Sequence, residues 1–260
     1  MKNKYLILVA FAMLLYGSST GLAGPSLGSA QNFAVLGAST VTNTGPSVIN
    51  GDLGVSPGTA ITGFGPIDGG PGIVNGNIYT GTAASQVHDD AIAAYAAAQT
   101  APGGVLGPAD LGGAILTPGV YTYAVAAPWA TAGTTLTLNA LGDPSSQWIF
   151  QIGSTLITPA SATVALINGA SANNVFWQVG TSATLGATNT FAGNILADQS
   201  IGFGGGTLDG RALAIGGAVT ISVAETINVP TTVPVPGAFL LVAIGMASLS
   251  VFRKRALILK

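Results

Sequence analysis

The sequence contains no cysteine and only one histidine, and only 6% of its residues are charged. Without cysteine the protein can form neither disulfide bonds nor thiolate metal sites, although this absence does not fix its compartment. The single histidine, His88, stands beside Asp89 and Asp90, and we expect it to be solvated. We therefore predict no metal site, no catalytic residue and no cofactor.

Cations are nearly absent from the middle of the chain. All lysines and arginines except Arg211 lie at the two ends, whereas the nine acids lie between Asp52 and Glu225. One cation against nine acids gives the central domain a formal charge of −8. Nucleic-acid binding requires a basic surface, so that class of partner is excluded. We expect Arg211 to pair with Asp209 or Asp198, or to donate to loop carbonyls.

The carboxylates do not form a catalytic pattern. Asp198 and Asp209 are near enough in sequence to approach each other, and such a pair suggests glycoside hydrolysis or a calcium site. However, no further acids cluster around them, and the chain has one glutamate. The glycine-rich run 202–206 is followed by neither a lysine nor a helix start, so it is not a nucleotide loop. The sequence predicts a protein that is not an enzyme.

What the chain does have is abundant glycine, 38 of 260 residues, and a repeat of small Thr, Ser, Gly and Ala residues. Aligning four segments on one threonine places Thr163, Thr190, Thr207 and Thr226 in one column. A period near 18 residues with β-branched residues and glycine turns is typical of a β-solenoid, in which each repeat forms one coil. The four segments are Gly153–Val164, Gly180–Phe191, Gln199–Leu208 and Gly217–Ile227.

One segment, about residues 85–100, breaks the strand pattern. It has no glycine or proline and is rich in alanine, and Ser85 is a suitable N-cap. Its apolar residues recur at helical spacing, which predicts one buried face and a helix packed lengthwise against the solenoid. The predicted buried face consists of Val87, Ala91, Ala94, Tyr95 and Ala98.

Six strings of the domain resemble those of the microbial ice-binding-protein family, in the family's order and over about Leu27–Val229. The resemblance implies a mainly β, discontinuous solenoid of triangular cross-section, with an α-helix along one side and a flat ice-binding β-face. The strings are Phe33–Gly54, Asp110–Tyr121, Trp148–Gly153, Asn174–Gly180, Gly193–Ala197 and Gly210–Ala214.

The family's ice-facing motif, Thr-Ala/Gly-x-Thr/Asn, is matched loosely near Thr184 and Thr158. From the motif and the repeat we predict an ice-binding face of small polar residues and an ice crystal surface as the partner. The alternative is an adhesive matrix protein that binds exopolysaccharide or the cell envelope without affinity for ice. The candidate ice-binding residues are Thr158, Ser161, Thr163, Thr184, Thr188, Thr190, Thr207, Thr220 and Thr226.

Both ends of the chain have the pattern of export signals. Residues 1–23 combine two lysines, an apolar run and small residues, which predicts a secretory signal peptide cleaved before Gly24. We interpret 24–229 as the folded domain and 230–237 as a proline-rich linker. Residues 238–260, an apolar stretch followed by a basic cluster, complete the chain.

This C-terminal arrangement resembles the PEP-CTERM class of bacterial sorting signals, which a membrane-bound processing enzyme cleaves. The chain has Val235 between Pro234 and Pro236, where that class has glutamate. A simple membrane anchor is the alternative, although the apolar stretch is shorter than the roughly 20 residues of a full span. Either interpretation predicts a domain outside the cytoplasm, secreted or attached to the cell surface.

Overall fold

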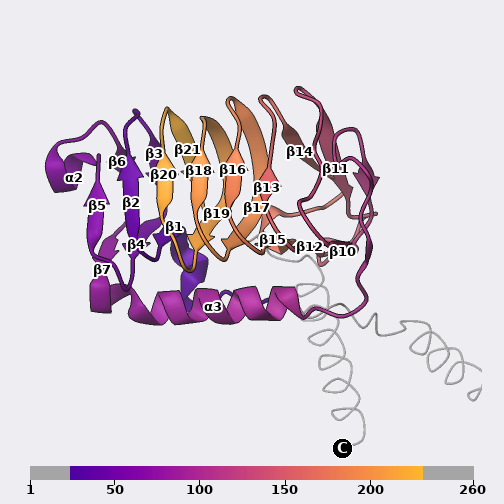
Figure 1. Ribbon diagram of the computed structural model, residues 1–260, viewed down its shortest axis with the longest axis horizontal. Coiled ribbons are helices and arrows are strands. Elements are labelled where there is room, and N and C mark those ends of the chain that lie inside the picture. Colours follow the sequence, from indigo (N-terminus) through magenta and orange to yellow (C-terminus); the bar gives the residue numbers. More distant parts are fainter. Residues whose placement is uncertain (1–23, 231–260) are drawn as a thin grey trace, which may run out of the picture.

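The computed structural model describes residues 24–230, which form a discontinuous β-solenoid with three faces and one long helix along its side (Figure 1). All the strand pairs are parallel, as expected when each coil stacks on the next. The predicted signal peptide and the C-terminal segment after Pro230 lie outside the described residues. In the described part of the chain, no helix is long and apolar enough to cross a membrane.

The first face is a separate parallel sheet, here called the six-stranded face. Its strands lie side by side across the solenoid in Figure 1, and each contributes a few residues. Their spatial order is β13 (Leu156–Ile157), β16 (Ala183–Leu185), β18 (Ile201–Phe203), β20 (Val219–Ile221), β2 (Thr40–Asn43) and β5 (Ala60–Thr62).

The other two faces belong to one large sheet that bends around a corner. The first residues of the long strands β17 (Asn189–Ala197) and β19 (Gly206–Ala214) pair on one face, and their last residues pair on the next. The ladder face comprises their first halves with β9 (Ile115–Leu116), β11 (Thr135–Asn139), β14 (Thr163–Ile167), β21 (Glu225–Asn228), β3 (Val48–Asn50) and β6 (Ile73–Val74). The helix-covered face comprises their second halves with β8 (Val105–Leu106), β10 (Gly119–Tyr123), β12 (Trp148–Ile152), β15 (Val175–Val179), β1 (Phe33–Gly37), β4 (Asp52–Val55) and β7 (Ile78–Thr80).

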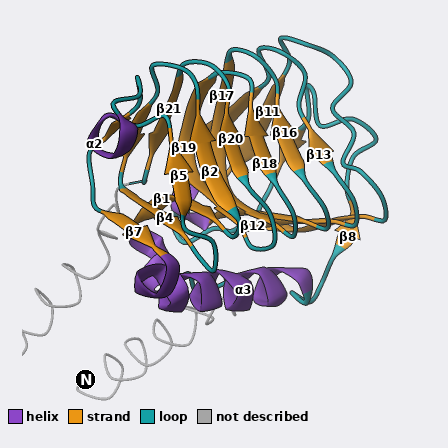
Figure 2. Ribbon diagram, turned by 60° about the vertical axis from the view of Figure 1, so that its left-hand side comes forward, coloured by secondary structure: helices purple, strands orange, loops and turns teal. Residues whose placement is uncertain are grey.

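The helix α3 (Ser85–Gln99) runs along the solenoid and covers this third face (Figure 2). The residues that it buries are those predicted from the spacing. They pack on outward-facing side chains of the sheet, including Ile149, Phe176 and Leu213. Ser85 is the first residue of the helix and not its cap, and its hydroxyl donates to the Thr82 carbonyl. Shorter helical turns are η1 (Gly28–Asn32), α2 (Gly65–Asp68), η2 (Gly81–Ala84) and η3 (Ala172–Asn174).

The first N-terminal coil, β1 to β3, stacks between the second N-terminal coil, β4 to β6, and the last C-terminal coil, and not on the coils that begin after α3. Strand β2 pairs with β20, β1 with β19 and β3 with β21. This pairing confirms the discontinuous solenoid that the family resemblance implied. It also brings two distant parts of the sequence together on each face.

Aromatic side chains fill the interior of the solenoid. The rings of Phe150 and Trp177 stack with centroids 3.9 Å apart, and Phe191 packs against Trp177 at 5.0 Å. The Trp177 indole donates to the Ala192 carbonyl at 3.0 Å, so its polar atom is satisfied although the side chain is fully buried. A packed interior of this kind holds the three faces rigid.

Arg211 fastens the N-terminal segment to the solenoid. Its guanidinium donates to the Gln31 carbonyl and to the side chains of Asn173 and Asn194, the last at 2.7 Å. Of the two predicted roles, donation to a backbone carbonyl is correct, although that carbonyl belongs to Gln31 in the helical turn η1 and not to a loop; no ion pair with Asp198 or Asp209 is found among the described residues. Burial lowers the pKa of Arg211 to about 10, so it remains charged at neutral pH.

Replacing Arg211 with lysine is expected to lower the free energy of unfolding by about 2 kcal/mol, because an ammonium cannot reproduce the forked contacts. Urea denaturation of the purified protein measures this change. The exposed Gln199, replaced by alanine, is the control and should leave the midpoint nearly unchanged. Equal urea midpoints for the native protein and Arg211→Lys would show that the forked contacts of Arg211 do not stabilise the fold.

Candidate functional site

The six-stranded face carries a central row of outward side chains in register. The backbone pairing aligns one outward residue from each strand, in the order Ile157, Thr184, Gly202, Thr220, Thr42 and Thr62. On both sides of this row, buried residues such as Ile201 and Phe203 point into the core. The row therefore stands on a packed support with four threonines pointing outward.

The threonine hydroxyls of this row are available to solvent. Thr184, Thr220 and Thr62 are exposed and Thr42 is half-buried. Within residues 24–230 none of the four hydroxyls forms a hydrogen bond with the protein. No residue of the six strands is charged. The face thus offers unpaired hydroxyls and methyl groups without a charge that would hold its own hydration shell.

A second line of small residues borders the row and is tied to the backbone. The Ser182 hydroxyl accepts from the Ser200 amide at 3.2 Å, and the Ser200 hydroxyl accepts from the Ala218 amide at 3.1 Å. These contacts link consecutive coils at the edge of the face. They restrict movement of one coil against the next, so the spacing of the row is preserved.

The ladder face carries the threonine column predicted from the repeat. Thr163, Thr190, Thr207 and Thr226 lie in register as predicted, and Thr135 extends the column by one strand. These five residues are called the threonine ladder. Val48 and Ile73 continue it at the other end.

The rest of the ladder face is neither uncharged nor flat. Asp209 stands two residues after Thr207 on the same side of β19, and it is exposed. Amide side chains follow on the neighbouring strands, where Asn75 donates to Asn50 and Asn50 donates to Asn228. A hollow beside the ladder is lined by Leu166, Asn168, Asp209 and Asn228, among other residues. A charge and a hollow therefore interrupt the ladder face, whereas the strands of the six-stranded face carry no charged residue.

The predicted site residues are thus divided between two faces and the corner that joins them. Thr184 and Thr220 lie on the six-stranded face, and four others lie in the ladder. Ser161 and Thr188 occupy the corner, with φ angles of 57° and hydroxyls 2.8 Å apart.

Thr158 was predicted wrongly as a surface residue. It is 3% exposed, and its hydroxyl accepts from the Gly186 amide and the Asn189 side chain. It points inward because it directly follows Ile157, the outward last residue of β13, and continues the alternation of side chains.

Thr42 and Thr62 were missed by the sequence reasoning. Their strands do show the alternation of threonine with apolar residues, TVTNT and AIT. That local signal identifies strands with an outward threonine. It does not reveal that they continue a row begun by Thr184, because the pairing joins distant segments.

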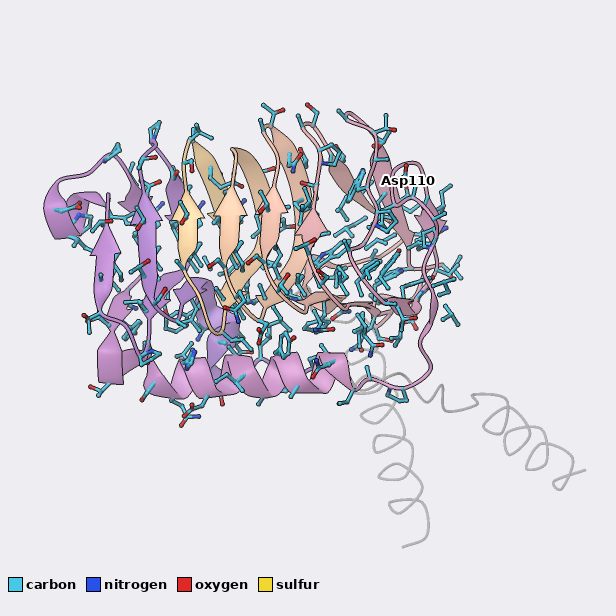
Figure 3. All side chains as sticks on the ribbon, in the orientation of Figure 1. Asp110 is labelled. Atoms are coloured by element: carbon cyan, nitrogen blue, oxygen red, sulfur yellow. The ribbon has the colours of Figure 1, made fainter. Side chains whose placement is uncertain are left out.

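Several of the acids accept hydrogen bonds within turns, among them Asp68, Asp110 and Asp143. Asp110, labelled in Figure 3, accepts from the amides of Gly112 and Ala130 in a loop at one end of the solenoid. Among the described residues, no three His, Asp or Glu side chains form a group able to hold a metal ion. Asp209 lies opposite Ala192 within the ladder face, whereas Asp198 follows β17 at another corner, so the two do not meet.

His88 differs from its prediction. It is half-buried, and its Nε2 lies 2.8 Å from the Ile215 carbonyl oxygen. The ring thus joins α3 to the chain after β19 and is not simply solvated. This contact therefore has a structural role.

Comparison with known proteins agrees with this arrangement. The family described as ice-binding-like matches residues 35–228. An ice-binding protein of Nostoc sp. (strain HG1) is 48% identical over 224 residues, covering 84% of this chain and 80% of its own length. An ice-binding protein of Flammulina populicola is 34% identical, covering 80% of this chain and 91% of the relative.

Solved structures show the same fold. The crystal structure of an ice-binding protein from an Antarctic biological consortium superposes with a TM-score of 0.75 at 43% identity, covering 82% of this chain and 95% of the other. That of the Antarctic ascomycete Antarctomyces psychrotrophicus gives a TM-score of 0.73 at 40% identity, covering 81% and 100%.

Proposed function

This chain belongs to the ice-binding-like family, and from that premise we propose that it binds ice through the six-stranded face and acts without catalysis. The observation that supports the assignment is the uncharged central row with its unpaired threonine hydroxyls. The contact residues would be Thr184, Thr220, Thr42 and Thr62, with Ser and Ala neighbours around them.

The spacing of the row suits an ordered layer of water. Neighbouring parallel strands lie about 4.8 Å apart, so equivalent hydroxyls repeat at that distance across the sheet. That repeat is close to an oxygen spacing of the ice lattice. Water molecules held by such a row would already be placed as they are in a crystal. Each contact is weak, and adsorption follows from their number.

Threonine is well suited to this task. Its β-branched side chain has few rotamers on a strand, so little conformational entropy is lost when ice binds. The hydroxyl holds water and the methyl group disfavours free hydration. A surface that is already rigid binds without the cost of reordering. The backbone contacts of Ser182 and Ser200 support that rigidity.

The ladder face is the weaker candidate. The exposed Asp209 would retain a hydration shell that competes with an ice lattice. The hollow next to the ladder would separate part of that face from a flat crystal. The threonine ladder is therefore assigned to the fold, where β-branched residues favour strands.

Secretion or display on the cell surface completes the proposal. Gly24 and Pro230, at the two ends of the described chain, line one hollow together with Phe176 and Arg211. Neither end lies on the six-stranded face, so a tether at either end would leave that face free. Such a protein would inhibit the growth or recrystallisation of ice, or hold cells against it.

Growth of single ice crystals in the purified protein tests the proposal. Faceted crystals, a gap between melting and freezing temperatures (thermal hysteresis) and slower recrystallisation are the expected results. Crystals that grow as rounded discs without hysteresis at high protein concentration would overturn it. If the protein shows no activity on ice but binds exopolysaccharide in a pull-down assay, the alternative of an adhesive matrix protein would be favoured instead.

A further inference from the structure

We infer that Gly202 limits the affinity of this protein for ice, because it is the one gap within an otherwise continuous row of threonines. This inference rests on the proposed function of the six-stranded face. In the register of that face, Gly202 lies between Thr184 on one side and Thr220 on the other. It occupies β18, near the middle of the sheet.

The backbone does not require glycine at this position. Gly202 is absent from the glycines with positive φ, so an L-residue can adopt its conformation. A Cβ atom built on it has no heavy atom within 4 Å apart from those of Gly202 itself and its two chain neighbours. Gly202 itself is half-buried. A β-branched side chain therefore has both the conformation and the space that it needs.

The neighbouring glycines differ in this respect. A Cβ on Gly186 would lie 2.7 Å from the backbone of Pro159, and one on Gly204 would lie 3.0 Å from the backbone of Gly186. These two glycines allow close packing of successive turns at the corner. Gly202 has no such role in packing, so the absence of its side chain affects only the exposed row of the six-stranded face.

The gap divides the row into unequal parts. Thr220, Thr42 and Thr62 form a continuous run over three strands, and Thr184 stands apart beyond the glycine. A threonine at 202 would join them into five consecutive strands, lengthening the run from about 10 Å to about 19 Å. Because adsorption depends on many aligned weak contacts, the longer run is expected to bind more strongly.

The test is to measure thermal hysteresis of the native protein and of Gly202→Thr at equal molar concentrations. We expect an increase of about twofold in the variant, since the added contacts lie on a preformed surface. Gly119→Thr is the matched control. Gly119 is also a half-buried strand glycine without positive φ, its Cβ would have no neighbour closer than 3.8 Å, and it lies outside the six-stranded face.

The outcomes separate this inference from the proposed function. An active native protein with no increase in a folded Gly202→Thr variant would overturn the inference alone. A native protein and a Gly202→Thr variant that are both inactive would overturn the proposed function and the inference together. Circular dichroism and the melting temperature establish folding. If the threonine variant does not fold, Gly202→Ala, which fills the gap with a methyl group, should give a smaller increase, and its failure to do so would count equally against the inference.

Discussion

Replacing Thr220 with tyrosine is expected to lower thermal hysteresis about tenfold, as for a residue at the centre of a binding surface. Thr220 is exposed in the central row, between Thr42 and the gap at Gly202. A tyrosine ring would project above the neighbouring side chains and hold a flat crystal away from them. Folding should be retained, because the side chain points to solvent and tyrosine is well accepted in strands.

The same change on the ladder face is the control. Thr190 is also exposed in a parallel strand, and it lies in the threonine ladder. Thr190→Tyr should leave the hysteresis close to that of the native protein. If Thr190→Tyr removes activity and Thr220→Tyr does not, the ladder face binds ice and our assignment of the face is wrong.

Glu225 provides the second prediction, which concerns stability. Its side chain is 4% exposed at the start of β21, and its backbone amide donates to the Ser47 hydroxyl. Burial raises the pKa of its carboxyl from 4.5 to about 8. The group is therefore neutral in the folded protein at pH 7, whereas it is ionised in the unfolded chain.

The native protein is expected to lose stability as the pH rises from about 4.5 to about 8. In this window the unfolded chain has released the Glu225 proton and the folded protein still holds it, so each pH unit costs about 1.4 kcal/mol. Below this window both states are protonated, and the stability contribution is complete. Above it both are ionised, and the loss reaches its limit.

Glu225→Gln should remove this slope, because glutamine has a similar shape and does not titrate. The measurement is urea denaturation of both proteins across pH 4 to 9. The variant should be the more stable protein at pH 8, with the difference shrinking toward pH 4. Other acids titrate in both proteins, so they cancel in the difference. Parallel curves for the two proteins would show that Glu225 is not held neutral.

Much of the fold could be predicted from the sequence because its signals are local or periodic. The alanine-rich run without glycine identified α3 and its buried face, and the repeat placed Thr163, Thr190, Thr207 and Thr226 in one column. Stacking of similar coils necessarily aligns equivalent residues. The absence of cysteine and of central cations excluded whole classes of function.

The candidate site was harder to predict because the turns at the corners of the solenoid determine on which face each threonine lies. Thr184 and Thr190 are six residues apart, but the chain turns between them at Thr188, whose φ is 57°. One turn of this kind moves the following residues to another face. Thr158 was difficult to place for a related reason: side chains alternate between the two sides of a strand, so a shift of one residue decides whether a side chain is exposed or buried.

The sequence by itself determined the solenoid, its helix and its family, since these depend on composition, repeat and ordered motifs. Only the tertiary structure decided which threonines form a surface. Thr42 and Thr220 are far apart in the chain and become neighbours because β2 pairs with β20. The backbone groups that join distant coils are the same in every residue, so the sequence does not show which strands pair. The central row and its gap at Gly202 therefore become visible only when the coils are stacked.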